Sequence, residues 1–285
     1  MPAADAAIEI DGLRKSYGRF EAVRGLSLNV RRGEIFAFLG PNGAGKTTTV
    51  EILEGFRKRD AGDVRVLGVD PEHGDRAWRT RIGIVLQEGQ AQPELTVRET
   101  LELWAAYYPS PRPLDETIAL AGLDEKAGDR VGRLSGGQRR RLDVALALIG
   151  DPDLVFLDEP TTGFDPVARR AAWKVIAGLR DLGKTVFLTT HYLDEAQALA
   201  DRVAIVKDGR ILAEGPPGDL DPGAASRYRV SWLAGGVPVV HETDDPTRLL
   251  HEATAAALAR GETLEALSVT RPSLEDVYLE LTAGA

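Results

Sequence analysis

Apolar and polar residues alternate in short runs along the first 80 positions, and glycine-containing turns separate the runs. The segments IEI (8–10), EIFAFL (34–39) and DVRVLG (63–68) predict strands. The segment KTTTVEILEG follows Gly45 and predicts a helix that ends at Gly55. The chain is therefore expected to begin with strands and a single early helix.

The apolar spacing changes to a helical period in the region from about 89 to 150. Val97, Leu101, Trp104 and Tyr108 follow one another at the spacing of one face of an amphipathic helix. Two further helical patterns cover 114–123 and 135–149. This region reads as a helical subdomain inserted between β-rich segments.

A strand–helix alternation follows the helical region. LVFLD (154–158) is a continuous apolar run, as expected for a strand buried on both faces of a parallel sheet. The pattern then predicts a helix over 166–181, a strand over 185–190, a helix near 192–200, and strands over 203–209 and 210–215. This order calls for an α/β fold with a mainly parallel sheet that helices cover.

The last quarter of the chain has a different pattern. GPPGDLDPG (215–223) is typical of a linker. The tail predicts a hairpin around Gly235 and Gly236, then a helix over 246–260, a strand over 263–270 and a helix over 273–281. We therefore predict two domains, a large one over 1–222 and a small accessory αβ domain over 223–285.

Composition narrows the classes of function. The 285 residues carry 35 Lys+Arg against 44 Asp+Glu, so the net charge of −9 gives no support to a nucleic-acid partner. The absence of cysteine excludes disulfides, thiolate zinc sites, iron–sulfur clusters and cysteine nucleophiles. No apolar run approaches the roughly 20 residues of a membrane helix, and the N-terminus does not have the pattern of a secretion signal. We expect a soluble chain that reaches a membrane only through a partner.

Residues 40–48 carry a phosphate-binding pattern. GPNGAGKTT matches G-x-x-x-x-G-K-[ST] between a predicted strand and a predicted helix, where backbone N–H groups and the helix N-terminus can bind phosphates. Lys46 would reach the β- and γ-phosphates, and the Thr47 hydroxyl would bind Mg²⁺. The candidate nucleotide-binding residues of this loop are Gly40, Pro41, Asn42, Gly43, Ala44, Gly45, Lys46, Thr47 and Thr48.

The segment LVFLDEP (154–160) supplies two candidate acidic residues. The buried strand would deliver Asp158 to its carboxyl end, where α/β sheets bind ligands. Asp158 can hold Mg²⁺, and a carboxylate at Glu159 can polarise an attacking water.

The segment LSGGQ (134–138) places a serine and two glycines before a predicted helix, which makes a second anion-binding surface. The phosphate loop, LSGGQ and LVFLDEP, in this order, resemble the nucleotide-binding subunit of an ATP-binding cassette (ABC) transporter over roughly residues 7–215. The resemblance implies the P-loop NTPase fold of an ABC cassette, with a mainly parallel core sheet, an N-terminal antiparallel β region and an inserted helical subdomain. It also implies that LSGGQ, the signature segment of the family, contacts nucleotide through Ser135, Gly136, Gly137 and Gln138.

The resemblance extends to single residues outside these motifs. Tyr17 lies where the family stacks an aromatic ring on adenine, and Val23 would flank the same base. Gln87, in IGIVLQE, matches the glutamine that links the Mg²⁺ site to the helical subdomain. The implied cofactors are ATP and Mg²⁺.

Two loops near the second acidic strand complete the matched positions. TTGFD (161–165) matches the loop that crosses to a second subunit, with Asp165 as its acid, although the family more often has leucine where this chain has Phe164. His191, in LTTHYLDEA, matches the histidine that contacts the γ-phosphate. The resemblance therefore implies a catalytic set and a metal-binding set. The catalytic set is Glu159, His191, Lys46 and Gln87, and the metal ligands are Thr47, Gln87 and Asp158.

The family resemblance also implies partners. Two copies would pair head to tail so that each LSGGQ covers the partner's ATP, and a separate membrane permease would hold the dimer at the cytoplasmic face of the membrane. The wording GGQRRRLDVALALIGDPDLVFLDEP and the terminal SLEDVYLELT resemble ATPase subunits of bacterial daunorubicin-resistance-type exporters, which export drugs, antibiotics, lipids or polysaccharides. The alternatives are an importer subunit and a soluble ABC-type ATPase that acts on a non-membrane partner.

Overall fold

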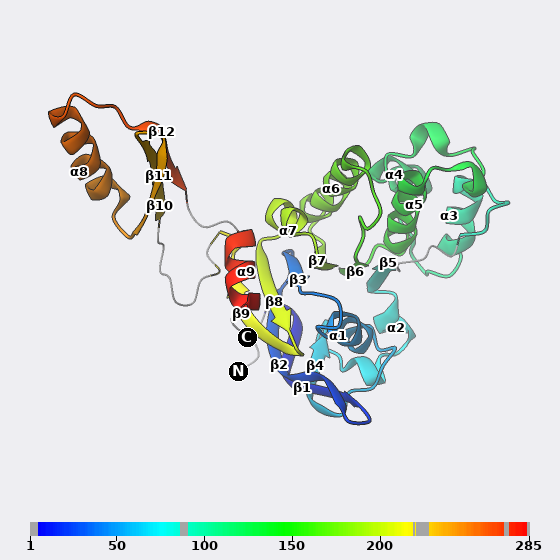
Figure 1. Cartoon of the computed structure of the whole chain (residues 1–285). Helices are drawn as coiled ribbons and strands as arrows, with labels where there is room; N and C mark the ends of the chain where they lie inside the picture. The colour runs from blue at the N-terminus through cyan, green and yellow to red at the C-terminus, as the bar shows by residue number, and fades with distance from the viewer. Residues whose placement is uncertain (1–4, 86–90, 219, 221–227, 271–273, 284–285) are drawn as a thin grey trace. The chain divides into compact units, whose positions relative to one another are not determined.

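The computed structural model describes residues 5–85, 91–218, 220, 228–270 and 274–283 (Figure 1). The chain divides into two compact units, Met1–Glu214 and Gly215–Ala285. The division comes at Glu214, whereas the sequence pattern places the domain boundary after residue 222. The pattern puts the boundary at the end of the linker, and the compact first unit ends before the linker begins.

A six-stranded sheet in the order β5-β6-β7-β3-β8-β9 forms the centre of the first unit. The pairs β5–β6, β6–β7, β7–β3 and β3–β8 are parallel. The strands are β3 (Ile35–Leu39), β5 (Ile82–Val85), β6 (Leu154–Asp158), β7 (Thr185–Thr190), β8 (Arg202–Lys207) and β9 (Arg210–Gly215). The predicted α/β class and mainly parallel sheet are confirmed. The strand β5, which the sequence analysis did not identify, is only four residues long and lies just before residues 86–90.

Four phenylalanines fix the middle of this sheet. Phe187 of β7 lies beside Phe36 of β3 and Phe156 of β6 in the strand register, and all three are fully buried. The Phe187 ring centroid is 5.8 Å from that of Phe36, 5.8 Å from that of Phe156 and 5.5 Å from that of Phe38. Each ring buries a large apolar area, and the offset and tilted contacts suit aromatic pairs. The three strands are therefore held in one register by their own side chains.

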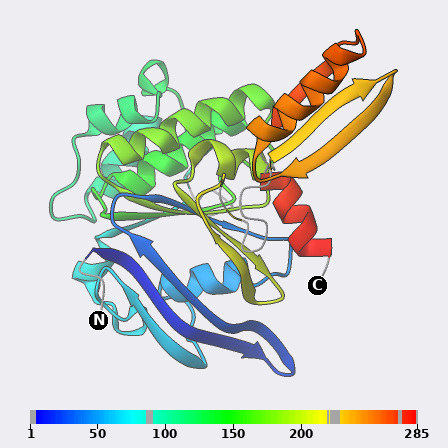
Figure 2. The same ribbon diagram turned by 90° about the vertical axis from the view of Figure 1, so that its left-hand side faces the viewer.

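A second, antiparallel sheet in the order β2-β1-β4 lies at the N-terminus. It contains β1 (Ala6–Tyr17), β2 (Phe20–Arg31) and β4 (Ala61–Val66). The helix α1 (Lys46–Leu53) packs against β2, β4 and β6. Figures 1 and 2 show α1 and this sheet on one side of the six-stranded sheet and α6 (Pro166–Asp181) on the other.

The strand β2 is absent from the sequence-based prediction. Its second half alternates buried Leu26, Leu28 and Val30 with polar residues, which is the pattern of a half-buried strand. Its first half pairs with β1 through two register shifts, one between Arg24 and Leu26 and one between Glu21 and Val23, which interrupt that alternation. The apolar period is therefore visible over only half of the strand.

The helical subdomain predicted for about 89–150 is present. It consists of α3 (Val97–Ala105), α4 (Leu114–Leu120) and α5 (Gly136–Leu148), with short turns of 3₁₀ helix at Asp124–Lys126 and Val131–Arg133. Val97 and Leu101 of α3 are buried in its core, and Trp104 and Tyr108 pack against that core. The predicted helical face is confirmed, although the helix ends at Ala105, before Tyr108.

The second unit contains a three-stranded antiparallel sheet and two helices. The sheet has the order β11-β10-β12, and the elements are β10 (Tyr228–Ala234), β11 (Val237–Thr243), α8 (Pro246–Ala259), β12 (Glu265–Thr270) and α9 (Leu274–Ala283). The hairpin turns at Gly235 and Gly236, whose φ angles of 60° and 82° favour glycine. Within the described residues, no helix of either unit has the length and hydropathy needed to span a bilayer.

Candidate nucleotide-binding and hydrolysis site

The loop between β3 and α1 depends on two glycines that admit close backbone approach. A Cβ atom on Gly40 would lie 2.4 Å from the Val206 carbonyl oxygen. Gly45 has a φ of 96°, and a Cβ atom there would lie 2.4 Å from the Ala22 carbonyl oxygen. Any larger residue would push the loop away from β8 or β2. The glycines therefore seat the loop at the carboxyl end of the central strand β3.

Lys46 begins α1 and points back into this loop. Its Nζ donates hydrogen bonds to the Gly40 carbonyl at 2.8 Å and to the Pro41 carbonyl at 3.3 Å. Nζ also lies 3.7 Å from Oε1 of Glu159, and the lysine is 6% exposed. Burial lowers the pKa of Lys46, while the charges of Glu159 and Asp158 act in the opposite direction. The cation is thus held where a phosphate chain would follow the loop.

The carboxyl ends of β6 and β7 lie side by side next to this loop. Asp158 ends β6 and pairs in register with Thr189 of β7. The Thr189 hydroxyl donates to the Asp158 carboxylate, which fixes that side chain. His191 follows β7 directly. Because parallel strands end at one edge of a sheet, residues 46, 158 and 191 meet there despite their separation in sequence.

Glu159 lies at the centre of the site in an uncommon backbone conformation. Its φ is 46°, a left-handed value that costs a residue with a Cβ atom about 1–2 kcal/mol. Its Oε2 accepts from the Thr162 hydroxyl at 3.2 Å and lies 3.2 Å from His191 Nδ1. The carboxylate therefore contacts Lys46, Thr162 and His191 together, and its side chain is only 15% exposed.

The predicted base-binding residues differ in their exposure. Tyr17 is 43% exposed, and its hydroxyl lies 3.4 Å from the Thr48 hydroxyl of α1. The Arg57 guanidinium lies over the Tyr17 ring, 5.2 Å from the centroid. Val23 is fully buried, and its Cγ2 would lie 3.6 Å from a Cβ atom on Gly45. Tyr17 is therefore open to a ligand, whereas the Val23 side chain packs beneath the loop and does not reach solvent.

The signature segment begins α5 as a helix cap. The Ser135 hydroxyl accepts from the Gln138 N–H at 3.2 Å, and the Gln138 side chain accepts from the Ser135 N–H at 2.9 Å. This reciprocal pair is a capping box. Asp165 likewise caps α6, accepting from the N–H groups of Val167 at 2.8 Å and Ala168 at 2.9 Å. Both predicted segments therefore lie at helix N-termini.

The structure thus gathers some of the predicted residues and not others. Lys46, Asp158, Glu159 and His191 meet at one sheet edge, with the exposed Thr47 beside Lys46 on α1. The signature residues lie at the start of α5 in the helical subdomain. Gln87 lies outside the described residues. The other three histidines of the chain, His73, His241 and His251, are exposed.

Thr189 and Arg140 contact the turn that carries Glu159, here called the catalytic turn, and both are absent from the sequence-based candidates. Thr189, described above, lies two positions before His191, at the end of an apolar strand. Arg140 of α5 donates to the Asp158 carbonyl at 3.0 Å and to the Pro160 carbonyl at 3.1 Å. Arg140 stands one turn before the buried Val144 on the inner face of α5. An arginine on that apolar stripe is the signal that would have identified it.

A buried carboxylate near the site was also missed. Glu54 follows α1 and is 7% exposed. Burial raises its pKa to about 8, and the neighbouring carboxylates of Asp158 and Glu51 add to the increase. Glu54 is therefore largely neutral at pH 7, so it adds little negative charge beside Asp158.

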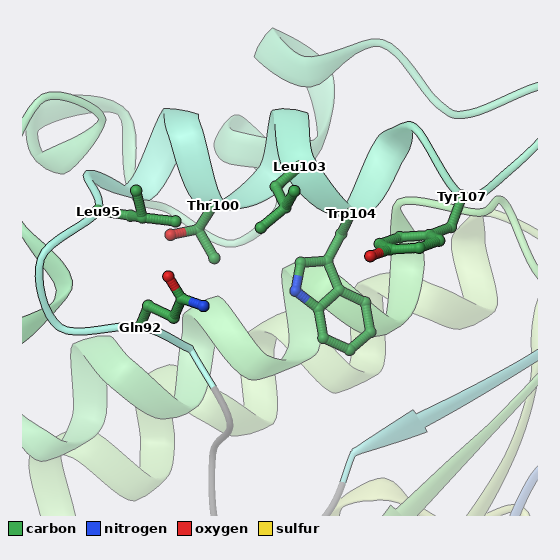
Figure 3. A pocket seen from close by; sticks show the side chains of 6 residues that line it. All are labelled: Gln92, Leu95, Thr100, Leu103, Trp104 and Tyr107. Atoms are coloured by element: carbon green, nitrogen blue, oxygen red, sulfur yellow. The ribbon is translucent and has the colours of Figure 1, made fainter.

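A separate pocket of about 420 Å³ lies along α3 (Figure 3). Gln92, Leu95, Thr100, Leu103, Trp104 and Tyr107 line it. Leu103 is 44% exposed and Tyr107 is 63% exposed. The lining is mostly apolar and aromatic, without the cations and loop N–H groups that bind phosphate, so this surface suits packing against another apolar surface.

The chain is similar to known proteins along almost its whole length. Residues 23–162 match the family model described as "ABC transporter". A Nod factor export ATP-binding protein I from Ralstonia nicotianae is 40% identical, over 96% of this chain and 93% of the relative. A protein of the same name from Rhizobium sp. (strain N33) is 41% identical, over 97% of both chains.

Solved structures agree with the sequence relatives. The ATP-binding cassette MJ0796, solved as a dimer in a post-hydrolysis state with ADP and Pi, is 27% identical with a TM-score of 0.65. The match covers 73% of this chain and 98% of that one. A solved ATP-binding subunit of an ABC transporter has a fold that matches 97% of this chain and 99% of its own chain, with a TM-score of 0.70 at 24% identity.

The pH dependence of the unfolding free energy tests the buried charges on α5. Burial raises the pKa of Asp143 on α5 to about 6, against the opposing charges of Arg140 and Arg139. The folded state therefore binds a proton that the unfolded state has lost between about pH 4 and 6, so this group lowers stability as pH rises through that range.

In Asp143→Asn that contribution is absent. The unfolding free energy of the variant relative to the wild type should rise by up to about 1.4 kcal/mol per pH unit between pH 4 and 6 and then level off. Urea unfolding of both proteins from pH 4 to 8 measures the difference, and parallel pH curves would contradict the assignment.

Proposed function

The chain belongs to the ABC transporter family as an ATP-binding, ATP-hydrolysing subunit, and on that premise we propose that it drives export through a separate membrane permease. The assignment of ATP hydrolysis rests on four residues that lie together at one edge of the sheet, Lys46, Asp158, Glu159 and His191. Phosphoryl transfer needs positioning and neutralisation of charge, and these side chains supply both.

We assign each residue of the site a distinct role. Lys46 binds the phosphate chain, for which its cation is already directed into the loop. Glu159 orients the attacking water and accepts its proton, and His191 contacts the terminal phosphate beside Glu159. Lys46 and His191 lie 3.7 Å and 3.2 Å from the Glu159 carboxylate, so the three roles meet at one place.

The residues present also fit a bound Mg²⁺. Hard cations prefer oxygen ligands, and the Thr47 hydroxyl and the Asp158 carboxylate provide them next to the loop. Gln87 is the third proposed ligand. When bound, the ion would neutralise charge on the phosphate oxygens. Thr189 would keep the Asp158 carboxylate oriented for it.

We propose that two copies pair head to tail around two ATP molecules. Ser135–Gln138 lie at the N-terminus of α5, where N–H groups favour anions. They lie in the helical subdomain, apart from the cluster of Lys46 and Glu159. A second copy would bring its own α5 to the nucleotide, with Asp165 in the loop between the subunits.

We propose that the transport direction is export. The relatives that cover almost the whole chain are named for Nod factor export. The exported molecule would be a drug, an antibiotic, a lipid or a polysaccharide, as for the exporters that the sequence resembles. The permease would hold the dimer at the cytoplasmic face of the membrane. The competing functions are import and action on a non-membrane partner. Co-purification of the chain with a six-helix membrane protein would distinguish the two transporter functions, export and import, from action on a non-membrane partner.

Glu159→Gln tests the assignment of the water-orienting group. The amide keeps the shape of the side chain but removes its basicity, so turnover should fall by at least about 100-fold. ATP should still bind, and an ATP-bound dimer should accumulate on gel filtration. Near-normal phosphate release would refute the role of Glu159.

Mixed dimers test the shared sites. Ser135→Arg places bulk and charge against the partner's nucleotide, and Lys46→Ala removes a charge-assisted contact to phosphate. Each variant alone should be inactive. A mixture should recover part of the activity, because one site of each mixed dimer carries both changes and the other carries neither. Ser135→Thr is the control, because it keeps the capping hydroxyl. A failure to recover activity, when mixed dimers are shown to form, would contradict the head-to-tail arrangement.

Truncation after Gly215 tests the second unit, which we propose strengthens subunit pairing or permease assembly. Every nucleotide-binding motif lies before this point, so ATP binding should be unchanged. Assembly with the permease and transport should decrease. Full-rate transport by the truncated protein would instead show that the second unit is an appendage without a role in coupling.

A further inference from the structure

The turn that carries Glu159 needs support from its surroundings. Its left-handed φ of 46° is a conformation that a residue with a Cβ atom holds only when neighbouring groups impose it. The direction of the Glu159 carboxylate depends on this backbone. A change in the turn would move the carboxylate away from Lys46 and His191, which lie 3.7 Å and 3.2 Å from it.

One support comes from the neighbouring strand of the same sheet. The Glu159 N–H donates to the Thr189 carbonyl at 3.1 Å and to the Thr189 hydroxyl at 3.1 Å. The next residues are held as well, because the Thr161 hydroxyl donates to the buried Glu195 carboxylate at 2.8 Å. These bonds fix the turn from the side of β7 and α7 (Leu193–Leu199).

A second support comes from an arginine of α5, the signature helix, which begins with the signature segment. Arg140 is 8% exposed, and its Nη2 and Nε donate to the carbonyls of Asp158 and Pro160 at 3.0 Å and 3.1 Å. These are the two carbonyls on either side of Glu159. A planar guanidinium presents several donors in a fixed arrangement, so one side chain can hold both carbonyls at a set spacing.

Arg140 connects two different parts of the first unit. It lies five residues after Ser135 on α5, and α5 belongs to the helical subdomain and not to the sheet. Asp143 lies 3.8 Å from its Nη1, one turn further along the helix, and offsets its charge. Arg140 is thus a direct tie between the helix that begins with the signature and the turn that carries Glu159.

We propose that Arg140 is a positioning residue for ATP hydrolysis, which holds the carbonyls of Asp158 and Pro160 so that the Glu159 carboxylate stays directed at the site. A displacement of α5 reaches the catalytic turn through this guanidinium. The inference rests on the role given to Glu159 under the proposed function. It adds that the signature helix controls the geometry of the turn within its own chain.

The test compares arginine variants on one helix in the full-length protein. Arg140→Met removes both donors and keeps an apolar stem, whereas Arg140→Lys keeps the charge and a single donor group. Arg141→Met is the matched control, because Arg141 also donates to backbone carbonyls, those of Gly122 at 2.8 Å and Ala121 at 3.4 Å, inside the helical subdomain. For each variant we would measure kcat and KM for ATP with Mg²⁺, the Kd for ATP, and the Tm.

Loss of positioning should appear in kcat and not in binding. Arg140→Met should lower kcat by about 10- to 100-fold. Its Kd for ATP should stay at the wild-type value, and its Tm should fall no further than that of Arg141→Met. Arg140→Lys should have an intermediate kcat, because one of the two carbonyls stays bonded. Arg141→Met should keep the wild-type kcat.

Two results would overturn the inference. One is a wild-type kcat in Arg140→Met, and the other is an equal loss of kcat in Arg140→Met and Arg141→Met, which would indicate general weakening of α5. If Arg140→Met does not fold, Arg140→Lys decides by the same comparison. Glu159→Gln, measured in parallel, separates the two levels of the argument. An active Glu159→Gln would remove the assigned role of Glu159, whereas an inactive Glu159→Gln with fully active Arg140 variants would remove only the positioning role.

Discussion

The parallel register of β3, β6 and β7 is the constraint on which the site depends. Phe187 packs against phenylalanines of β3 and β6, so the three strands cannot slide past one another without separating these rings. The register places Asp158 opposite Thr189 and brings the loop after β3 to the same edge. A shift of one residue would turn every side chain of a strand to the other face. The apolar core thus sets the positions of polar groups that it does not touch.

At that edge, opposite charges are held close together with little access to water. Lys46 is almost completely buried and lies near two carboxylates, while Glu54 is kept mostly neutral by its surroundings. Charges in such a place interact more strongly than they would in water. The Lys46 cation is directed into the glycine loop, and the Glu159 carboxylate lies next to that cation. This is the combination that phosphoryl transfer to water requires.

The helical subdomain is connected to the sheet by α5. The same helix begins with the capped signature segment and carries Arg140 on its inner face. Its apolar residues pack with α3 and α4 on one side, while β5 contacts it on the other. A polar contact to the catalytic turn is therefore built into the packing between the subdomain and the sheet. The second unit has its own sheet and helices and none of the nucleotide-binding motifs.

The α/β class, most of the elements and the residues of the phosphate loop could be predicted from the sequence, because apolar periods and glycine spacing are local properties. The sequence also indicated Asp158 and Glu159, at the end of a continuous apolar strand, whereas His191 was indicated by the family resemblance. It missed β2, where bulges interrupt the alternation, and β5, which is too short to show a period. The contact of Lys46 with Glu159, the burial of Val23 beneath the loop and the burial of Glu54 beside Asp158 became visible only in the folded chain. The role of Arg140 as a donor to two carbonyls also required the structure. Such contacts join residues far apart in the chain, and the packing of the sheet against α5 sets them, whereas no local pattern records which partners a side chain meets.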